Sequence, residues 1–252
     1  DIANKETAIK RKISSLKSFY RYFYERELIT VNPAALVHLP KIREKEIIRL
    51  DYDEVARLID EAESGDGLTK RQQDFHKRTK NRDVAMLALL LGTGMRVSEC
   101  VGIDLSDIDI RETAVNIHRK GGKEETVYFS DEVAGMIAPY MAERRTMLPE
   151  AGSENALFLS LQNKRMSVRS AELMVKKYAG IVTPLKHITP HKLRSTYGTH
   201  LYQETGDIYL VADVLGHRDV NTTRKHYAAI VEDNRRKAAS VVKLLDDGDK
   251  SR

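Results

Sequence analysis

The first regular element predicted by the sequence is an amphipathic helix over residues 5–26, because apolar residues recur there at steps of three and four. Its apolar stripe consists of Ile9, Ile13, Leu16, Tyr20 and Phe23. A short second helix is predicted to begin at Asn32, with Pro33 at its first position and Pro40 beyond its end. Two such helices bury little apolar surface, so we expect them to be the end of a larger domain whose beginning lies outside the sequence.

A second domain is predicted to follow the charged run at residues 41–50, which comes directly after a proline and is typical of an inter-domain linker. Asp51 is expected to cap a helix that ends near Glu63. The strongest apolar signal lies at residues 84–91, after a basic helix start at residues 70–82. This signal predicts a helix that is buried on almost all sides and ends at a glycine-containing turn.

The pattern changes to a period of two between about residues 108 and 129, which predicts two strands joined by a hairpin. Gly121 and Gly122 form the hairpin tip, between Lys120 and Lys123. Helices return after Ser130, a favourable helix cap. They are expected over residues 131–146, 167–179, 191–204, 207–215 and 229–245. The sequence therefore predicts a mainly α fold with a small antiparallel β-sheet.

Charge and composition narrow the class of protein only slightly. The chain has 252 residues, a formal net charge of +5 and a sequence pI of about 9.1, which is a mild hint of a polyanionic partner. A single cysteine, Cys100, excludes an intrachain disulfide and favours a reducing compartment, so we expect a cytoplasmic protein. The longest apolar run is too short to span a membrane.

Two arginine-containing segments have the character of anion sites. Arg96 follows the sharp Thr93-Gly94-Met95 turn, and Glu99 is placed either to pair with it or to orient a neighbouring base. His191 and Arg194 lie three residues apart at the start of a helix, where the backbone favours anions. Each segment alone is also compatible with ordinary salt bridges and caps, so the segments must be weighed together.

The third segment runs from His217 to Tyr227. The Leu215-Gly216 pair ends a predicted helix and leaves His217 in a loop, ten residues before a tyrosine in a polar setting. One cysteine and no carboxylate at ligand spacing cannot complete a tetrahedral zinc site, so no metal is predicted. Tyrosine has an ordinary pKa near 10 and needs activation before it can act as a nucleophile.

Taken together, the segments resemble those of the tyrosine recombinase family, which includes the phage integrases and the Xer proteins. The resemblance covers about residues 7–245 and rests on four motifs in this order: TGMRVSE at residues 93–99, HKLR at residues 191–194, LGH at residues 215–217, and Thr222-Thr223 leading to Tyr227. It implies a small helical core-binding domain followed by a catalytic domain, which together clamp DNA. The implied boundaries are residues 1–43, a linker at 44–50, a catalytic domain at 51–245 and a polar tail at 246–252.

The resemblance also implies a role for each motif residue. Arg96 and Arg194 would hold the scissile phosphate, His191 would assist as a base, and His217 would donate a hydrogen bond to the phosphate. Tyr227 would attack and form a 3′-phosphotyrosine, with no metal, ATP or other cofactor. Lys120 is the expected general acid toward the 5′-hydroxyl, with Lys123 as the second choice. Further DNA contacts are expected from Lys12, Lys17, Arg21, Lys123 and Lys192, although a solvated basic face explains the first three equally well.

The resemblance implies partners as well. They are double-stranded DNA with an inverted-repeat core site and three further copies of the chain, joined through the helix at 229–245 unless that helix packs in cis. Two departures stand out: Ser195 where many relatives carry histidine, and a ten-residue step from His217 to Tyr227 where Xer proteins usually show nine. The longer step favours an integrase of a mobile element over an Xer-type dimer resolvase. A type IB topoisomerase and a DNA-binding regulator without catalysis remain as competing interpretations.

Overall fold

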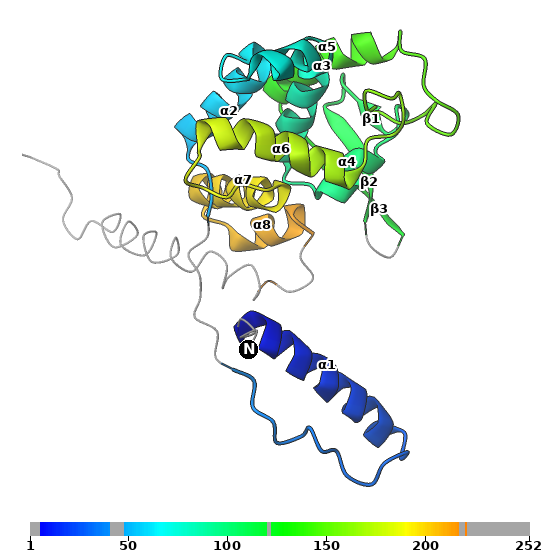
Figure 1. The fold of residues 1–252 in the computed structure, drawn as a ribbon. Coiled ribbons are helices and arrows are strands. Elements are labelled where there is room, and N and C mark those ends of the chain that lie inside the picture. The colour runs from blue at the N-terminus through cyan, green and yellow to red at the C-terminus, as the bar shows by residue number, and fades with distance from the viewer. Residues whose placement is uncertain (1–5, 41–47, 120–121, 217–219, 221–252) are drawn as a thin grey trace, which may run out of the picture. The chain divides into compact units, whose positions relative to one another are not determined.

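The computed structural model describes residues 6–40, 48–119, 122–216 and 220 (Figure 1). The chain divides into two compact units, residues 1–46 and residues 47–252, and each is described by itself. Within the described residues, no helix is both long enough and apolar enough to cross a membrane. The architecture is mainly helical with one small antiparallel sheet, so the predicted fold class is confirmed.

The first unit consists of helix α1 (Glu6–Glu25) and the extended chain that follows it. The bounds of α1 agree with the helix predicted over residues 5–26. The predicted second helix is wrong, because residues 33–36 form only a turn. The side chain of Asn32 accepts a hydrogen bond from the Ala34 amide at 3.0 Å, as a turn requires. Lys17 donates to two carbonyls just beyond, at Ala35 and Val37, and so holds this chain in place without a helix.

The second unit opens with helix α2 (Tyr52–Ser64), whose predicted cap at Asp51 is confirmed. The Asp51 carboxylate accepts from the Glu54 amide at 2.8 Å, and the Glu54 carboxylate accepts from the Asp51 amide at 2.8 Å. Gly65 ends the helix at a φ of +69°, a conformation that favours glycine. Reciprocal capping at one end and a glycine at the other explain why these bounds are readable from the sequence.

Helix α3 (Lys70–Thr93) is the central element of the second unit. Its first half is basic and largely exposed, whereas every residue from Asp83 to Leu90 is buried. The change in the sequence pattern at Asp83 therefore marks a change of surroundings within one continuous helix. The helix ends at Gly94, whose φ of +64° turns the chain sharply toward Arg96.

Several helices pack against α3, and the others pack against those helices; the labels in Figure 1 allow each to be followed. Helix α3 contacts α2, α5 (Asp131–Arg144) and α7 (Pro190–Thr205), while α6 (Val168–Val182) lies against α2 and the short α4 (Val97–Gly102). Helix α8 (Ile208–Val214) packs on α7. These bounds confirm the helices predicted at 131–146, 167–179, 191–204 and 207–215 to within a few residues. The helix predicted at 229–245 lies outside the described residues.

The sheet contains β1 (Ile108–Asp109), β2 (Ala114–Arg119) and β3 (Lys123–Tyr128), in that order and antiparallel. The predicted hairpin is confirmed, with Arg119 opposite Lys123 as the last pair before its tip. Alternate residues of β2, Val115 and Ile117, are buried in the core, as its period of two predicts. The pair of Arg119 and Lys123 therefore lies at the end of the sheet.

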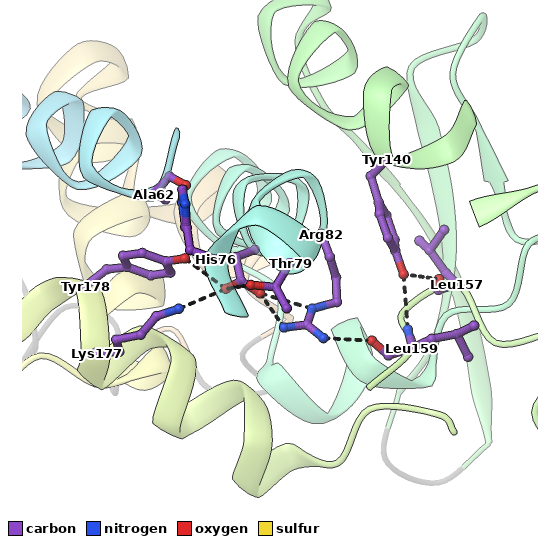
Figure 2. Close-up of polar contacts among 10 residues, drawn as sticks. Ala62, His76, Thr79, Arg82, Tyr140, Leu157, Leu159, Lys177 and Tyr178 are labelled. Atoms are coloured by element: carbon purple, nitrogen blue, oxygen red, sulfur yellow. Dashed lines mark hydrogen bonds and ion pairs between the residues drawn. The ribbon is translucent and has the colours of Figure 1, made fainter. Parts of the chain in front are cut away.

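A buried carboxylate, Asp83, joins α3 to α6 in the interior (Figure 2). Its side chain is 1% exposed and accepts from Arg82 at 2.6 Å, Lys177 at 3.1 Å and the Tyr178 hydroxyl at 2.9 Å. The Thr79 hydroxyl adds a fourth donor at 3.3 Å. A buried carboxylate is tolerated only when it is paired and hydrogen-bonded in this way. We call this group, with Asp83 at its centre, the Asp83 network.

Candidate active site

Arg96 is presented by the turn that ends α3. The turn is tight because the Thr93 hydroxyl donates to the Leu89 carbonyl at 2.6 Å and accepts from the Met95 amide at 3.2 Å. Gly94 packs closely on Tyr197, and a Cβ at this position would also lie 2.8 Å from Leu215. Only glycine meets both the space and the positive φ at this turn.

Glu99 fixes the direction of the Arg96 side chain. One carboxylate oxygen accepts from the Arg96 amide at 2.7 Å, and the other accepts from the guanidinium at 2.7 Å. The Glu99 side chain is 4% exposed, whereas that of Arg96 is 42% exposed. Of the two roles considered for Glu99, the structure shows the ion pair with Arg96. The pair holds the guanidinium rigidly while leaving one of its sides open to solvent.

Another arginine, Arg165, holds the C-terminal end of α4. Its guanidinium donates to the carbonyls of Val101, Gly102 and Ile103 at 3.1 to 3.2 Å and pairs with Asp104. A helix of six residues leaves most of its carbonyls without helical partners, and Arg165 supplies donors for them. Arg165 could not be predicted from the sequence, because its partners lie more than 60 residues away and leave no local pattern.

Arg194 joins the Arg96 turn to the end of α8. Its guanidinium is nearly buried and donates to the Gly94 carbonyl at 2.7 Å and to the Leu215 carbonyl. Gly94 lies two residues before Arg96, and Leu215 lies two residues before His217. One side chain thus brings together three of the motifs, since Arg194 lies 100 residues from Gly94 and 21 residues from Leu215 in the sequence. The five donors of a guanidinium allow it to serve several acceptors at once.

His191 lies at the start of α7, on the same side of the site as the two arginines. The pKa of its imidazole is lowered, first by partial removal from water and then by the positive charges of Lys192, Arg194 and Arg96. The ring is therefore neutral at pH 7 and able to accept a proton. Lys192, Arg194 and Arg96 are thus close enough to His191 for their charges to lower the pKa of its ring.

A hollow of about 460 Å³ lies beside Arg96, at the rim of the sheet. It is lined by Arg96, Ser98, Glu99, His118 and Arg119. Arg119 was not singled out from the sequence, although it directly precedes Lys120. Its side chain is only 8% exposed and pairs with Glu125 at 2.7 Å. A single basic residue at the end of a strand leaves no periodic pattern in the sequence. Only its contacts in the structure identify Arg119 as part of the site.

Some of the remaining predicted site residues lie outside the described residues, and the others belong to the second or the first unit. Lys120, His217 and Tyr227 lie outside the described residues. Lys123 is exposed on β3, with its amine 4.0 Å from Glu125. Lys192 is half-buried on α7 beside the histidine. In the first unit, Lys17 binds backbone carbonyls, Arg21 pairs with Glu25 at 2.6 Å, and Lys12 is exposed.

Among the described residues, no group of three or more His, Cys, Asp or Glu side chains is arranged to hold a metal ion. The buried thiol of Cys100 has a raised pKa, because burial disfavours the thiolate. What the described residues do offer is a set of fixed cations around a hollow, an arrangement suited to a phosphate group.

Comparison with known proteins identifies the class. Residues 48–233 match the model of the phage integrase family, and the chain belongs to that family. The chain is 33% identical over 222 residues to tyrosine recombinase XerC of Thermodesulfovibrio yellowstonii, a match that spans 87% of this chain and 70% of the relative. It is likewise 33% identical over 218 residues to XerC of Bacillus subtilis, spanning 86% and 68% of the two chains.

Solved structures agree with this assignment. The XerA recombinase superposes with a TM-score of 0.63 at 25% identity, over 93% of this chain and 84% of that one. The Tn1549 transposon integrase in complex with transposon right end DNA gives a TM-score of 0.72 at 18% identity, over 92% and 80%, which shows a shared fold. The protein is accordingly a tyrosine-type site-specific DNA recombinase, and the predicted family and enzyme class are confirmed.

Proposed function

We propose that Tyr227 is the nucleophile of this recombinase and that Arg96 and Arg194 hold the phosphate it attacks. The observation that carries this proposal is the bridge made by Arg194, which donates to Gly94 at one end and to Leu215 at the other. The bridge fixes the turn of Arg96 beside the chain that leads into His217. Arg96, Arg194, His217 and Tyr227 could together handle a phosphodiester. They belong to, or follow directly from, segments that the Arg194 guanidinium connects.

The reaction balances without a metal or an external energy source. The Tyr227 oxygen bonds to phosphorus while the bond from phosphorus to the 5′-oxygen breaks, and the leaving oxygen takes a proton from Lys120. The result is a 3′-phosphotyrosine and a free 5′-hydroxyl. In the second half a 5′-hydroxyl of another strand attacks the phosphotyrosine, and Tyr227 regains its proton. Because one phosphoester replaces another at each step, the energy of the bond is conserved.

The surrounding residues have complementary tasks. Guanidinium groups held in place before the reaction stabilise the extra charge of the pentavalent transition state. Arg96, fixed by Glu99 and open on one side, suits this task. A neutral His191 is able to take the proton of the tyrosine, and His217 donates a hydrogen bond to the phosphate. Lys192 contributes a nonspecific contact to the DNA backbone.

The nucleophile is tested with the variant Tyr227→Phe. We expect the variant to bind DNA as the native chain does and to form no covalent adduct on a nicked suicide substrate, as read on a denaturing gel. The matched control is Tyr209→Phe, a change on α8 at a side chain that is 71% exposed. Adducts that persist in Tyr227→Phe would remove the assignment. Loss of adducts in both variants would point to a structural effect.

The general acid is tested with a substrate that carries a bridging 5′-phosphorothiolate. A thiolate leaves without protonation, so this substrate should restore cleavage to Lys120→Ala and leave other defects unrepaired. The control is Lys123→Ala, three residues along the same hairpin. Rescue that appears only for Lys123→Ala would transfer the role to Lys123.

For the biological role, we propose integration and excision of a mobile element through a Holliday junction. The ten-residue step from His217 to Tyr227 supports this role, whereas the relatives named XerC favour resolution of chromosome or plasmid dimers. The two roles differ in product. Excision releases a DNA circle and reseals its flanks, whereas dimer resolution converts one circle into two. Sequencing the junctions that accumulate around the site protected by the protein decides between them.

We further propose that four copies act on two inverted-repeat DNA sites and are joined by the helix expected at 229–245. Residues 1–43, with Lys12, Lys17 and Arg21, would supply part of a DNA-binding domain. Removal of the chain after residue 230 should leave cleavage intact and abolish synapsis, measured as a four-copy complex by light scattering. An unfolded truncated chain would show instead that the helix packs in cis. Relaxation of supercoils by monomers would favour a topoisomerase, and DNA binding without any adduct would favour a regulator.

A further inference from the structure

Arg119 has surroundings that a purely structural role does not explain. Its side chain is 8% exposed, yet two of its nitrogens, Nε and Nη1, are buried with no hydrogen-bond partner among the described residues. Buried donors without acceptors are rare in folded proteins and often mark functional positions. The remaining nitrogen, Nη2, donates to the Val214 carbonyl at 3.1 Å and pairs with Glu125 at 2.7 Å.

The guanidinium of Arg119 rests directly on Gly216. A Cβ at position 216 would coincide with Nη1, so no side chain other than hydrogen fits there while Arg119 keeps its place. Gly216 has a φ of +59°, which favours glycine independently. Arg119 thus spans from the last residue pair of the β2–β3 hairpin to the residue directly before His217.

Two elements of the site therefore meet at one side chain. On one side, Arg119 directly precedes Lys120 and lies opposite Lys123 in the strand register. On the other, it binds Val214 and contacts Gly216, while Arg194 binds Leu215 between them. The end of α8 is held from two directions, by an arginine of α7 and by an arginine of the hairpin.

We propose that Arg119 is a positioning residue that couples the hairpin to the end of α8, so that Lys120 is held in register with the segment from His217 to Tyr227. This inference rests on the proposed function of Lys120 as the general acid. Arg119 does not touch the phosphate in this proposal; it transmits the position of one element to the other.

The first test is Arg119→Ala in the full chain, with Arg111→Ala as the matched control, since Arg111 is an exposed arginine in the turn before β2. Single-turnover cleavage should fall on the order of 100-fold in Arg119→Ala, the usual effect of a misplaced catalytic group, and stay unchanged in the control. The 5′-phosphorothiolate substrate should restore most of the loss. Arg119→Lys should recover part of the native rate, because an ammonium keeps the charge beside Val214 and Glu125.

The salt dependence of DNA binding separates positioning from direct contact. A lost phosphate contact lowers the slope of log affinity against log salt by about one. We expect no change of slope in Arg119→Ala, and a lower slope would overturn the proposal in favour of a phosphate ligand. Native cleavage by Arg119→Ala, or a defect that the phosphorothiolate leaves untouched while it rescues Lys120→Ala, would also overturn it. Failure of the phosphorothiolate to rescue Lys120→Ala itself would instead overturn the assignment of the acid.

A double-variant cycle with Gly216 tests the contact whichever residue is the acid. Gly216→Ala places a methyl group where Nη1 lies, so its cleavage should fall as in Arg119→Ala. The strain of alanine at a positive φ remains in both backgrounds, but the contact can be lost only once, so the combined loss in the double variant should be smaller than the product of the two single losses. Defects that multiply would overturn the coupling. Thermal unfolding of each variant guards against a simple loss of fold, and Arg119→Lys keeps the test usable if Arg119→Ala unfolds.

Discussion

The Asp83 network and the region around Arg96, Arg119 and Arg194 both collect charged side chains, but they balance them differently. In the network, one carboxylate that is 1% exposed lies between two cations and two hydroxyls. In the arginine region, Glu99 and Glu125 each pair with one arginine, and Arg194 binds neutral carbonyls. The first arrangement completes the hydrogen bonds of an interior carboxylate. The second leaves the Arg96 guanidinium partly exposed beside a hollow, where it can meet an anion from outside.

Residue type alone therefore does not distinguish a structural cation from a functional one. Arg82 and Arg165 donate to interior carbonyls and carboxylates and hold elements together. Arg96 is held just as firmly but from one side only. Arg96 differs from the two structural arginines because one side of its guanidinium stays exposed to solvent.

The largest effect on stability is expected for Asp83→Ala. The change leaves Arg82 and Lys177 beside each other without their shared carboxylate, and breaking a buried ion pair from one side costs about 3 kcal/mol. The free energy of unfolding in urea measures this loss. The matched control is Asp74→Ala on the same helix, where the side chain is 78% exposed and the change should stay within about 0.5 kcal/mol. Equal stability of the two variants would erase the distinction drawn between the two regions.

A large effect on rate without an effect on stability is expected for Arg96→Lys. Lysine keeps the charge but loses the fork that grips two oxygens, so cleavage should fall about 100-fold. The measurement is single-turnover cleavage, with Arg111→Lys as the control. The melting temperature should stay at the native value. A lowered melting temperature would show that Arg96 belongs with the structural arginines.

An intermediate effect is expected from pH, through His191. The fold lowers the pKa of His191 below its ordinary value of 6.5, so the neutral ring predominates at pH 7. As the pH falls through the lowered pKa, the ring gains a charge beside three cations, and both its capacity as a base and its contribution to stability are lost. The rate constant kcat/KM should be level above pH 6.5 and fall about tenfold per unit below the lowered pKa. His191→Asn should be slower and lack this acid limb; an acid limb that persists would assign it to another group.

The smallest effect is expected for Tyr178→Phe, which removes one donor from the Asp83 network. The pKa of Tyr178 is raised by burial and by the nearby Asp83 carboxylate, so the hydroxyl stays protonated and acts as a donor. Its loss should lower the free energy of unfolding by about 1 kcal/mol. Cleavage by the folded variant should equal that of the native chain. A slower rate would mean that the network reaches the active site.

The elements were readable from the sequence where the signals are local. Asp51 and Ser130 cap their helices as predicted, and the alternation in β2 gives the correct buried face. The turn at residues 33–36 was misread as a helix, because Asn32 and Pro33 begin turns as readily as helices and only Lys17, 18 residues before Ala35, distinguishes them.

The site was only partly readable, for a related reason. Arg96, His191 and Arg194 stand in recognisable motifs, but the bond from Arg194 to Gly94 spans 100 residues and follows from no spacing. Arg119 binds Val214 across 95 residues, and Arg165 reaches Val101 across 64. Neither residue was predicted, since most of their long-range partners are backbone carbonyls, which every residue possesses. Asp83 lies between the basic run and the apolar run, and no pattern in the sequence marks it as the centre of the interior network.

Helix α3 carries both regions, with Asp83 at its middle and the Arg96 turn at its C-terminal end. Amides in the buried half of such a helix exchange with solvent only when the whole domain unfolds, whereas strand ends and short helices open locally at lower free energy. The Arg96 turn is therefore attached to the slowest-exchanging segment of the domain. We expect the hairpin and α8 to open at a lower free energy, so rearrangement on DNA should be seen in their amides first, against an α3 that serves as a fixed reference.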